Sequence, residues 1–257
     1  MDTGSGRSHH GAQLAVITAA VVGASGYTGG ELLRLLLGHP EVEVTQITSE
    51  RLGGRQATTA HPHLRGRTDL LFRPRSELGV ADIIFVTLRH GESSRDLDAL
   101  AARSTTIVDL AADFRLRDSR DYPRWYGWEH PAPQRLHDFV YGVAELHRDE
   151  LRGTDRIATG GCLATATILG LHPLVAGGLV NLAMPVTVEA KVGSSAAGAQ
   201  SSAASHHPHR SREMRSFAPT GHRHTAEILQ ELNLTRVTPG VAFSATAVEA
   251  VRGVLVT

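Results

Sequence analysis

The chain has 257 residues, 41% of them hydrophobic, and its 26 Lys and Arg residues balance 26 Asp and Glu residues. This length allows one large domain or two modest ones. Balanced charge gives no electrostatic reason to expect a nucleic-acid partner, and no apolar run reaches the roughly 18 residues that a membrane helix needs. The single cysteine excludes an intramolecular disulfide framework and a multi-cysteine zinc site. We therefore expect a cytoplasmic protein with no membrane and no nucleic-acid partner.

The first half of the chain alternates predicted strands and helices. It begins with a Gly-, Ser- and His-rich segment, residues 1–13, which is predicted to be a disordered tail rather than a signal peptide. The predicted strands cover residues 14–22, 41–48, 81–88 and 105–110, and the predicted helices cover residues 31–37 and 93–103. Strands alternating with helices predict an α/β fold with a Rossmann-like, doubly wound parallel sheet, which we assign to residues 14–160.

The second half, residues 161–257, is richer in predicted strands. We interpret residues 118–138, which precede it, as an irregular connection, and residues 164–171 as a helix that Pro173 ends or kinks. The further strands are predicted at residues 184–192, 236–247 and 252–256, around a histidine-rich loop at residues 205–224. Because the last strand-like run reaches Thr257, we expect this second domain to be incomplete.

A glycine pattern lies between the first strand and the first helix. Gly23, Gly26 and Gly29 are spaced so that backbone N–H groups could meet a pyrophosphate at the helix N-terminus. The alternative is an ordinary tight turn between strand and helix. Just after the second strand, Ser49 and Arg51 could hold the 2′-phosphate of NADP, whereas the acidic residue between them would favour NAD. We favour NADP.

The one cysteine, Cys162, follows two glycines and precedes a predicted helix. A helix N-terminus stabilises a thiolate, which is the nucleophilic form of cysteine. The glycines would let a substrate approach the sulfur closely. The alternative is a buried structural cysteine, which is the more common fate of a lone cysteine.

Several side chains could assist that thiol. His222 and His224 have a side chain suited to proton transfer near neutral pH. No H-E-x-x-H motif or cysteine cluster accompanies them, so no metal site is predicted, although a histidine-rich metal-binding protein is an alternative. Arg115 follows a strand at its C-terminal end, where it could bind an anionic substrate or form a surface ion pair. A further histidine group is interpreted as a solvated loop or a weak metal site: His206, His207 and His209.

Four segments in this order resemble the N-acetyl-γ-glutamyl-phosphate reductase family, relatives of aspartate-semialdehyde dehydrogenase. They are GASGYTGGELLRLL, DLAADFRL, GCLATATILGLHPL and GHRHTAEI. Three others are similar to the branch that acts on α-aminoadipate or glutamate linked to a small acidic amino-group carrier protein in lysine or arginine biosynthesis. These are HPHLRGRTDL, VGSSAAGAQSSAASHHPHRS and SFAPTGHRHTAEI.

The resemblance implies a semialdehyde-dehydrogenase-like fold, in which the second half is an α+β substrate and dimerisation domain, and NADPH-dependent reduction of an acyl phosphate to a semialdehyde. Cys162 would be the nucleophile that forms a thioester, and His222 the acid/base. Arg115, His224 and Glu227 would bind substrate. The residues implied in NADP(H) binding are Gly23, Ser25, Gly26, Tyr27, Thr28, Gly29, Ser49, Arg51, Ser195 and Gly198.

Two other functions stay open from the sequence. One is the same chemistry on free N-acetylglutamyl phosphate, and the other is a truncated, non-catalytic dinucleotide-binding module. Members of the family continue past the position of Thr257, so the resemblance implies that the second domain is partial. At full length we expect a homo-oligomer.

Overall fold

In the computed structural model of the chain, the residues whose structure is described are 16–203, 205–234 and 240–257. The first half forms a seven-stranded sheet in the order β3-β2-β1-β4-β5-β7-β6, and every neighbouring pair is parallel. Its strands are β1 (Ile17–Val22), β2 (Val42–Thr48), β3 (Phe72–Arg73), β4 (Ile83–Val86), β5 (Thr106–Asp109), β6 (Val140–Tyr141) and β7 (Arg156–Ala158). The predicted doubly wound parallel sheet is confirmed.

Helices follow the strands of this sheet, as the connections between parallel strands require. They are α1 (Tyr27–Leu36), α2 (Ala57–Ala60), α3 (Ser93–Ala101), α4 (Asp121–Tyr126) and α5 (Ala144–Arg152). One cluster of buried side chains joins β1 and β2 to α1 and includes Val21, Leu33 and Ile47. A second joins β4 and β5 to α3 and α4 and includes Ile84 and Tyr122.

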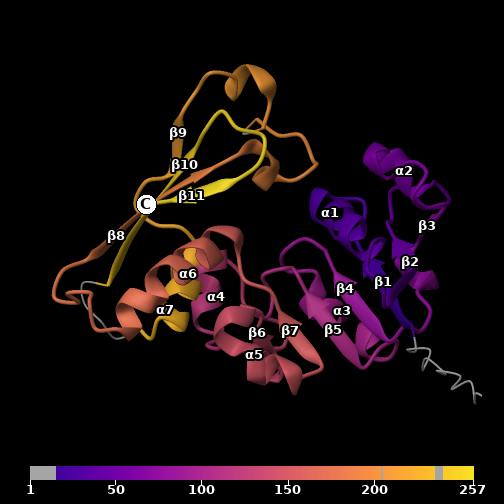
Figure 1. Cartoon of the computed structure of the whole chain (residues 1–257), viewed down its shortest axis with the longest axis horizontal. Coiled ribbons are helices and arrows are strands. Elements are labelled where there is room, and N and C mark those ends of the chain that lie inside the picture. Colours follow the sequence, from indigo (N-terminus) through magenta and orange to yellow (C-terminus); the bar gives the residue numbers. More distant parts are fainter. Residues whose placement is uncertain (1–15, 204, 235–239) are drawn as a thin grey trace, which may run out of the picture.

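The second half forms a four-stranded mixed sheet with two helices beside it (Figure 1). Its elements are α6 (Cys162–Ala176), β8 (Val186–Val192), β9 (Arg215–Ala218), α7 (His224–Glu231), β10 (Val241–Ala247) and β11 (Val254–Val256). The central strands β8 and β10 are parallel, whereas β9 and β11 pair antiparallel at the two edges. A third buried cluster unites α6, α7 and this sheet through Ile168, Ile228 and Phe243.

The structure corrects several predicted boundaries. The first helix begins at Tyr27 rather than at residue 31, and residues 118–138 are not irregular throughout, because they contain α4 and a 3-10 helix at Pro133–Asp138. Pro173 does not end α6. That helix continues to Ala176 and ends at Gly177, whose N–H donates to the Pro173 carbonyl at 3.1 Å.

Other differences concern short strands and segments outside the described residues. The loop predicted at residues 205–224 contains β9, and β3, β6 and β7 were not predicted. The predicted tail, residues 1–13, lies outside the described residues. So do residues 236–239, the first part of the strand predicted at 236–247. Within the described ranges, no helix has the length and apolar character to cross a membrane.

The turn between β1 and α1 is held by close backbone packing. A Cβ atom at Gly29 would lie 2.5 Å from the Ala24 carbonyl oxygen and 2.6 Å from its Cα. At Gly26, by contrast, a Cβ would meet nothing within 4 Å, and the φ angle of −83° suits any residue. Position 29 therefore requires glycine for packing, and position 26 does not.

Gly29→Ala is expected to lower the free energy of unfolding by roughly 3 kcal/mol, because backbone atoms of the turn must shift to admit the methyl group. Gly26→Ala is the matched control and should cost no more than about 1 kcal/mol, the usual scale for a residue that precedes a helix. Urea denaturation measures both. Equal losses in the two variants would contradict this account of the turn.

Candidate active site

The glycine turn lies at the C-terminal end of β1. Gly23 has a φ of +79°, which favours glycine, and its N–H donates to Thr48 Oγ1 at 3.1 Å. Tyr27 and Thr28 are the first two residues of α1 and are exposed. Because the first N–H groups of a helix have no partner within it, this exposed end can bind an anion.

The end of β2 is joined to the same turn. Ser49 is buried, and its hydroxyl donates to Ser25 Oγ at 2.9 Å. Arg51 follows on the surface and is exposed. The structure therefore brings together the predicted residues of the turn and of the β2 end.

The other two predicted nucleotide-binding residues belong to the second half. Ser195 lies in a 3-10 helix (Ser194–Ala197) that follows β8, and Gly198 ends that helix with a φ of +83°. The Ser195 N–H donates to the Val251 carbonyl at 2.9 Å. In the described part of the chain, no hydrogen bond joins these two residues to the glycine turn.

Cys162 is the first residue of α6, and it is exposed. The alternative of a buried structural cysteine is therefore wrong. A Cβ at Gly160 would lie 2.7 Å from Tyr141 Oη, and one at Gly161 would overlap with His224 Nε2 and lie 2.7 Å from its Cδ2. Both glycines are required because side chains from β6 and α7 occupy the space beside the backbone that leads to the thiol.

A buried carboxylate lies at the centre of this arrangement. Glu227, on α7, is 0% exposed. Its Oε2 accepts the Gly161 N–H at 2.8 Å and the Tyr141 hydroxyl at 2.7 Å. Its Oε1 lies 3.7 Å from Arg115 Nη1 and 3.8 Å from His224 Nε2. Burial, with Glu227 beside it, raises the pKa of Tyr141, so that hydroxyl stays protonated and donates.

Arg115 is buried, with 6% of its surface exposed. Its Nε donates to the Thr159 carbonyl at 2.8 Å and its Nη2 to the Leu110 carbonyl at 3.0 Å. The third nitrogen, Nη1, faces Glu227. The alternative of a surface ion pair is therefore wrong. Its guanidinium binds two backbone carbonyls and the Glu227 carboxylate.

The two histidines at the start of α7 are in contact. The ring centroids of His222 and His224 lie 4.5 Å apart, and the ring planes are at 81°. The backbone N–H of His224 donates to His222 Nδ1 at 3.2 Å. Burial, assisted by Arg223, lowers the pKa of His222 to about 4. Burial lowers the pKa of His224 as well. Both rings are therefore neutral near pH 7, and in His222 the free nitrogen is Nε2.

Sequence reasoning missed Tyr141 and a polar cluster at the C-terminal end of β5. Asp113 is 0% exposed and accepts the N–H groups of Gly91 and Ser94 at 2.8 and 2.9 Å. Burial raises the pKa of Asp109 to about 7. The segment DLAADFRL contained both carboxylates, and their position after a buried strand was the available signal. These carboxylates fix the loop that leads into α3.

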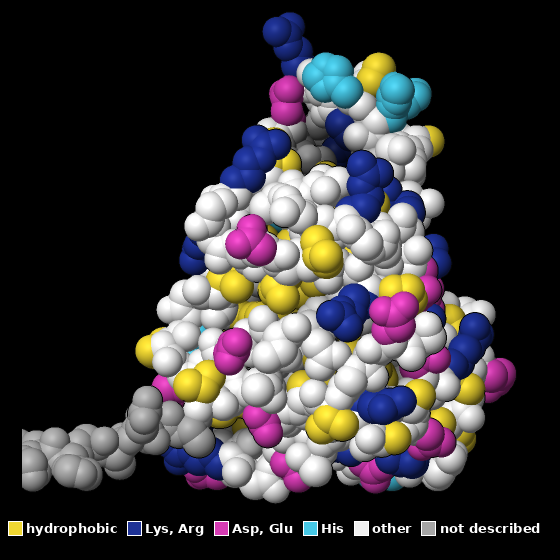
Figure 2. Space-filling view, turned by 90° about the vertical axis from the view of Figure 1, so that its right-hand side faces the viewer, with side chains coloured by type: hydrophobic (Ala, Val, Ile, Leu, Met, Phe, Trp, Pro, Cys, Tyr) yellow, Lys and Arg dark blue, Asp and Glu magenta, His cyan; other side chains and the backbone are white. Residues whose placement is uncertain are grey.

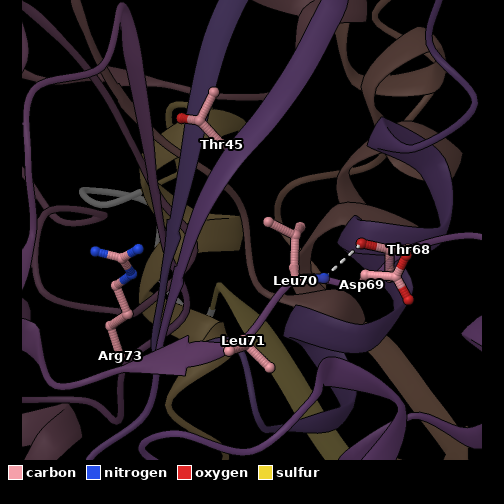
Figure 3. A pocket seen from close by; sticks show the side chains of 6 residues that line it. All are labelled: Thr45, Thr68, Asp69, Leu70, Leu71 and Arg73. Carbon is pink, nitrogen blue, oxygen red and sulfur yellow. Dashed lines mark hydrogen bonds between the residues drawn. The ribbon is translucent and has the colours of Figure 1, made fainter.

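Two surface features lie apart from this site. A depression of about 420 Å³ is lined by Thr45, Thr68, Asp69, Leu70, Leu71 and Arg73 at the β3 edge of the first sheet (Figure 3). Histidine side chains gather at the upper end of the face in Figure 2, the end occupied in Figure 1 by the connection from β8 to β9. Among the described residues, no three His, Cys, Asp or Glu side chains are grouped to hold a metal ion.

The fold and the site together define a class: a dehydrogenase with a dinucleotide-type turn in one domain and a cysteine at a helix N-terminus in the next. The chain belongs to the semialdehyde dehydrogenase family. Residues 18–154 match its NAD binding domain and residues 162–257 match its dimerisation domain.

Comparison with known proteins agrees with this assignment. The (LysW)-L-2-aminoadipate 6-phosphate reductase of Deinococcus radiodurans is 49% identical over 243 residues, which are 93% of this chain and 68% of that protein. A relative from Thermomicrobium roseum is 54% identical over 242 residues, covering 94% of this chain and 69% of the relative. The chain thus spans a little over two thirds of their length.

Solved structures share the fold. Aspartate semialdehyde dehydrogenase II of Vibrio cholerae has a TM-score of 0.65 at 14% identity, over 94% of this chain and 73% of that one. The aspartate semialdehyde dehydrogenase of Candida albicans, solved with NADP, has a TM-score of 0.57 at 14% identity, over 94% and 70%. At such identities the likeness concerns the fold alone.

Glu227→Gln is expected to lower the free energy of unfolding by about 3 kcal/mol, because it leaves the buried Arg115 guanidinium without a counter-charge. Glu150→Gln is the matched control. Glu150 is also a helix glutamate, but its side chain is 63% exposed, and its replacement should cost less than about 0.5 kcal/mol. Urea denaturation measures both. A loss no larger in the first variant than in the second would refute the pairing of Glu227 with Arg115.

Proposed function

We propose that the chain catalyses the NADPH-dependent reduction of an acyl phosphate, that of an α-aminoadipyl group linked through its amino group to a small acidic carrier protein, to the semialdehyde. The observation that carries the proposal is the exposed Cys162 thiol at the N-terminus of α6, beside the buried Glu227 and His224. The names of the two relatives that are 54% and 49% identical to this chain support the substrate class.

The first domain fits a dinucleotide. Space around Gly26 is open, since a Cβ there would meet nothing within 4 Å, and the exposed N-terminus of α1 lies directly behind it. Ser25, Tyr27, Thr28 and Gly29 would complete the pyrophosphate site. Ser49 and the exposed Arg51 would hold the 2′-phosphate, because a guanidinium pairs well with a phosphate. When bound, NADPH supplies the hydride.

Cys162 provides the covalent chemistry. Its sulfur attacks the acyl carbon, the bond from that carbon to the phosphate oxygen breaks, and inorganic phosphate leaves. The product of this step is a thioester on Cys162. After hydride reduction, the carbon–sulfur bond breaks, the semialdehyde departs and the thiol is restored. The N–H groups in the first turn of α6 have no partner within the helix and would stabilise the developing oxygen anion.

Proton transfer is assigned to His222. Its Nδ1 accepts the backbone N–H of His224, so in the neutral ring Nε2 carries the proton and is the nitrogen that donates it to substrate. Arg115, His224 and Glu227 were predicted to bind substrate. Since all three are buried, and Arg115 and His224 both contact Glu227, we propose that they act by positioning Gly161 and the two histidine rings.

The assembly follows from the same assignment. The second half belongs to a domain described as a dimerisation domain, which agrees with the expected homo-oligomer. The acidic carrier protein is the proposed macromolecular partner, and the cytoplasm is the proposed location. Ser195 and Gly198 are proposed to approach the nicotinamide from the second domain.

The purified chain should oxidise NADPH with carrier-linked aminoadipyl phosphate and not with free N-acetylglutamyl phosphate, measured by loss of absorbance of the reduced nicotinamide. Cys162→Ser should lower the rate at least about 1000-fold, because the hydroxyl is a far poorer nucleophile at neutral pH. Turnover of only the free acetylated substrate would refute the carrier assignment. NADPH binding without any turnover would indicate a non-catalytic module.

His222→Asn is expected to lower kcat by about 10²–10⁴-fold, the usual contribution of a general acid or base. Burial and Arg223 depress the pKa of His222 to about 4, so the ring stays neutral as pH falls through 6.5. The acid limb of kcat/KM due to this residue should therefore lie near pH 4. His224→Asn is the control and should lower kcat less. A larger loss in His224→Asn would transfer the proton-exchanging role to that residue.

A further inference from the structure

The segment that begins HPHL connects β2 to β3, and the proposed reaction gives it no role. His61, its first residue, lies between α2 and a 3-10 helix at Pro62–Leu64. The residue is only 3% exposed. A buried histidine with a defined hydrogen bond calls for an explanation, because burial of an imidazole costs free energy unless its polar atoms are paired.

The His61 ring reaches the glycine turn. Its Nε2 lies 2.7 Å from the carbonyl oxygen of Ala24. Because a carbonyl only accepts, Nε2 must carry the proton, and the ring donates this bond. Burial lowers the pKa of His61 and so favours the neutral form. Phe72 of β3 packs edge-on against the ring, with centroids 6.4 Å apart.

The ring also fixes the position of α1. A Cβ at Gly30 would overlap with His61 Nδ1 and would lie 2.6 Å from its Cε1. The imidazole therefore occupies the space that a side chain at position 30 would take, against the first turn of the helix. A single side chain from the β2–β3 connection thus contacts both the turn and the helix that follows it.

Ala24 is restrained on three sides as a result. Its N–H donates to the Thr48 carbonyl at 2.9 Å, its own carbonyl accepts from His61, and Gly29 packs directly against it. The neighbouring N–H groups of the turn and of α1 are those that the proposed pyrophosphate site uses. Their geometry before ligand arrives depends on how firmly Ala24 is held.

We propose that His61 is a positioning residue that preorganises the glycine turn for the dinucleotide. This inference rests on the proposed nucleotide site. Preorganisation strengthens binding because the ligand does not have to order the turn. The His61–Ala24 bond should therefore affect nucleotide affinity, with little effect on the chemistry at Cys162, which lies on α6 in the second half of the chain.

The test is NADPH titration of the 257-residue chain by nucleotide fluorescence, without the acyl phosphate, together with steady-state kinetics. His61→Phe keeps the ring volume and removes the donor, and it should weaken NADPH binding about tenfold, the scale of one lost hydrogen bond. The kcat at saturating NADPH and the KM for acyl phosphate should change less than about twofold. His61→Gln restores an N–H donor and should recover most of the affinity.

His63→Phe is the matched control, since His63 lies two residues away in the same segment and is exposed. It should leave NADPH affinity unchanged. If His61→Phe lowers only the melting temperature and binds NADPH as tightly as the parent, the residue is merely structural and the inference is overturned. If the parent chain itself does not bind NADPH, the proposed cofactor fails instead.

A double-mutant cycle covers the case in which His61→Phe folds poorly. Gly30→Ala should displace the ring and weaken NADPH binding about as much as His61→Ala does. In the Gly30→Ala, His61→Ala double variant the added methyl meets no ring, so the losses should not add. Additive losses would show that the two positions act independently and would also overturn the inference.

Discussion

The candidate active site depends on one buried carboxylate that joins parts of the chain far apart in sequence. Glu227 accepts the N–H of Gly161, the residue before Cys162, and the hydroxyl of Tyr141 from the first sheet. An ionised carboxylate inside a protein is tolerable only when hydrogen bonds and an opposite charge replace water. Arg115 provides that charge, and it is in turn held by two backbone carbonyls. The start of α6 is consequently held against α7 by a hydrogen bond to a carboxylate that is buried away from solvent.

Three buried or half-buried histidines, His61, His222 and His224, are neutral hydrogen-bonding groups rather than cations. Burial lowers the pKa values of His61, His222 and His224 alike. A neutral imidazole has one donor and one acceptor, so the partner of one nitrogen determines the role of the other. His61 donates to Ala24, and His222 accepts from the His224 N–H. A histidine can therefore hold a turn in the first half of the chain and pack against a second imidazole ring in the other half.

Much of the fold was predictable because its central strands are continuous apolar runs. Most of β1 is buried, and β4 and β5 alternate buried with half-buried residues in a parallel sheet. Such apolar strands are recognisable without knowledge of their neighbours. The two-residue strands β3 and β6 were not, since their pairing depends on β2 and β7 rather than on any local pattern. Short helices such as α4 are likewise stabilised by tertiary packing, here through the buried Tyr122.

The candidate site was predictable to a similar extent. Two preceding glycines and a following helix made Cys162 the candidate nucleophile in the sequence, and the structure shows which rings lie against those glycines. The burial of Arg115 and Glu227 could not be inferred, because their contact spans more than a hundred residues of chain. A motif states which residue types occur, whereas the fold decides whether a charged group faces solvent or another charge.

Ala226, on α7, packs in the same buried cluster as Ile84 and Ile107 of the first sheet, although it belongs to the second half of the chain. The contact between the two halves, here called the seam, is therefore part of one hydrophobic core rather than an exposed surface. A chimaera that joined the first half of this chain to the second half of a distant family member would have to carry compatible residues at positions 115, 141, 226 and 227 together. Residues on opposite sides of the seam should for this reason evolve as a unit, even where the surrounding sequences diverge freely.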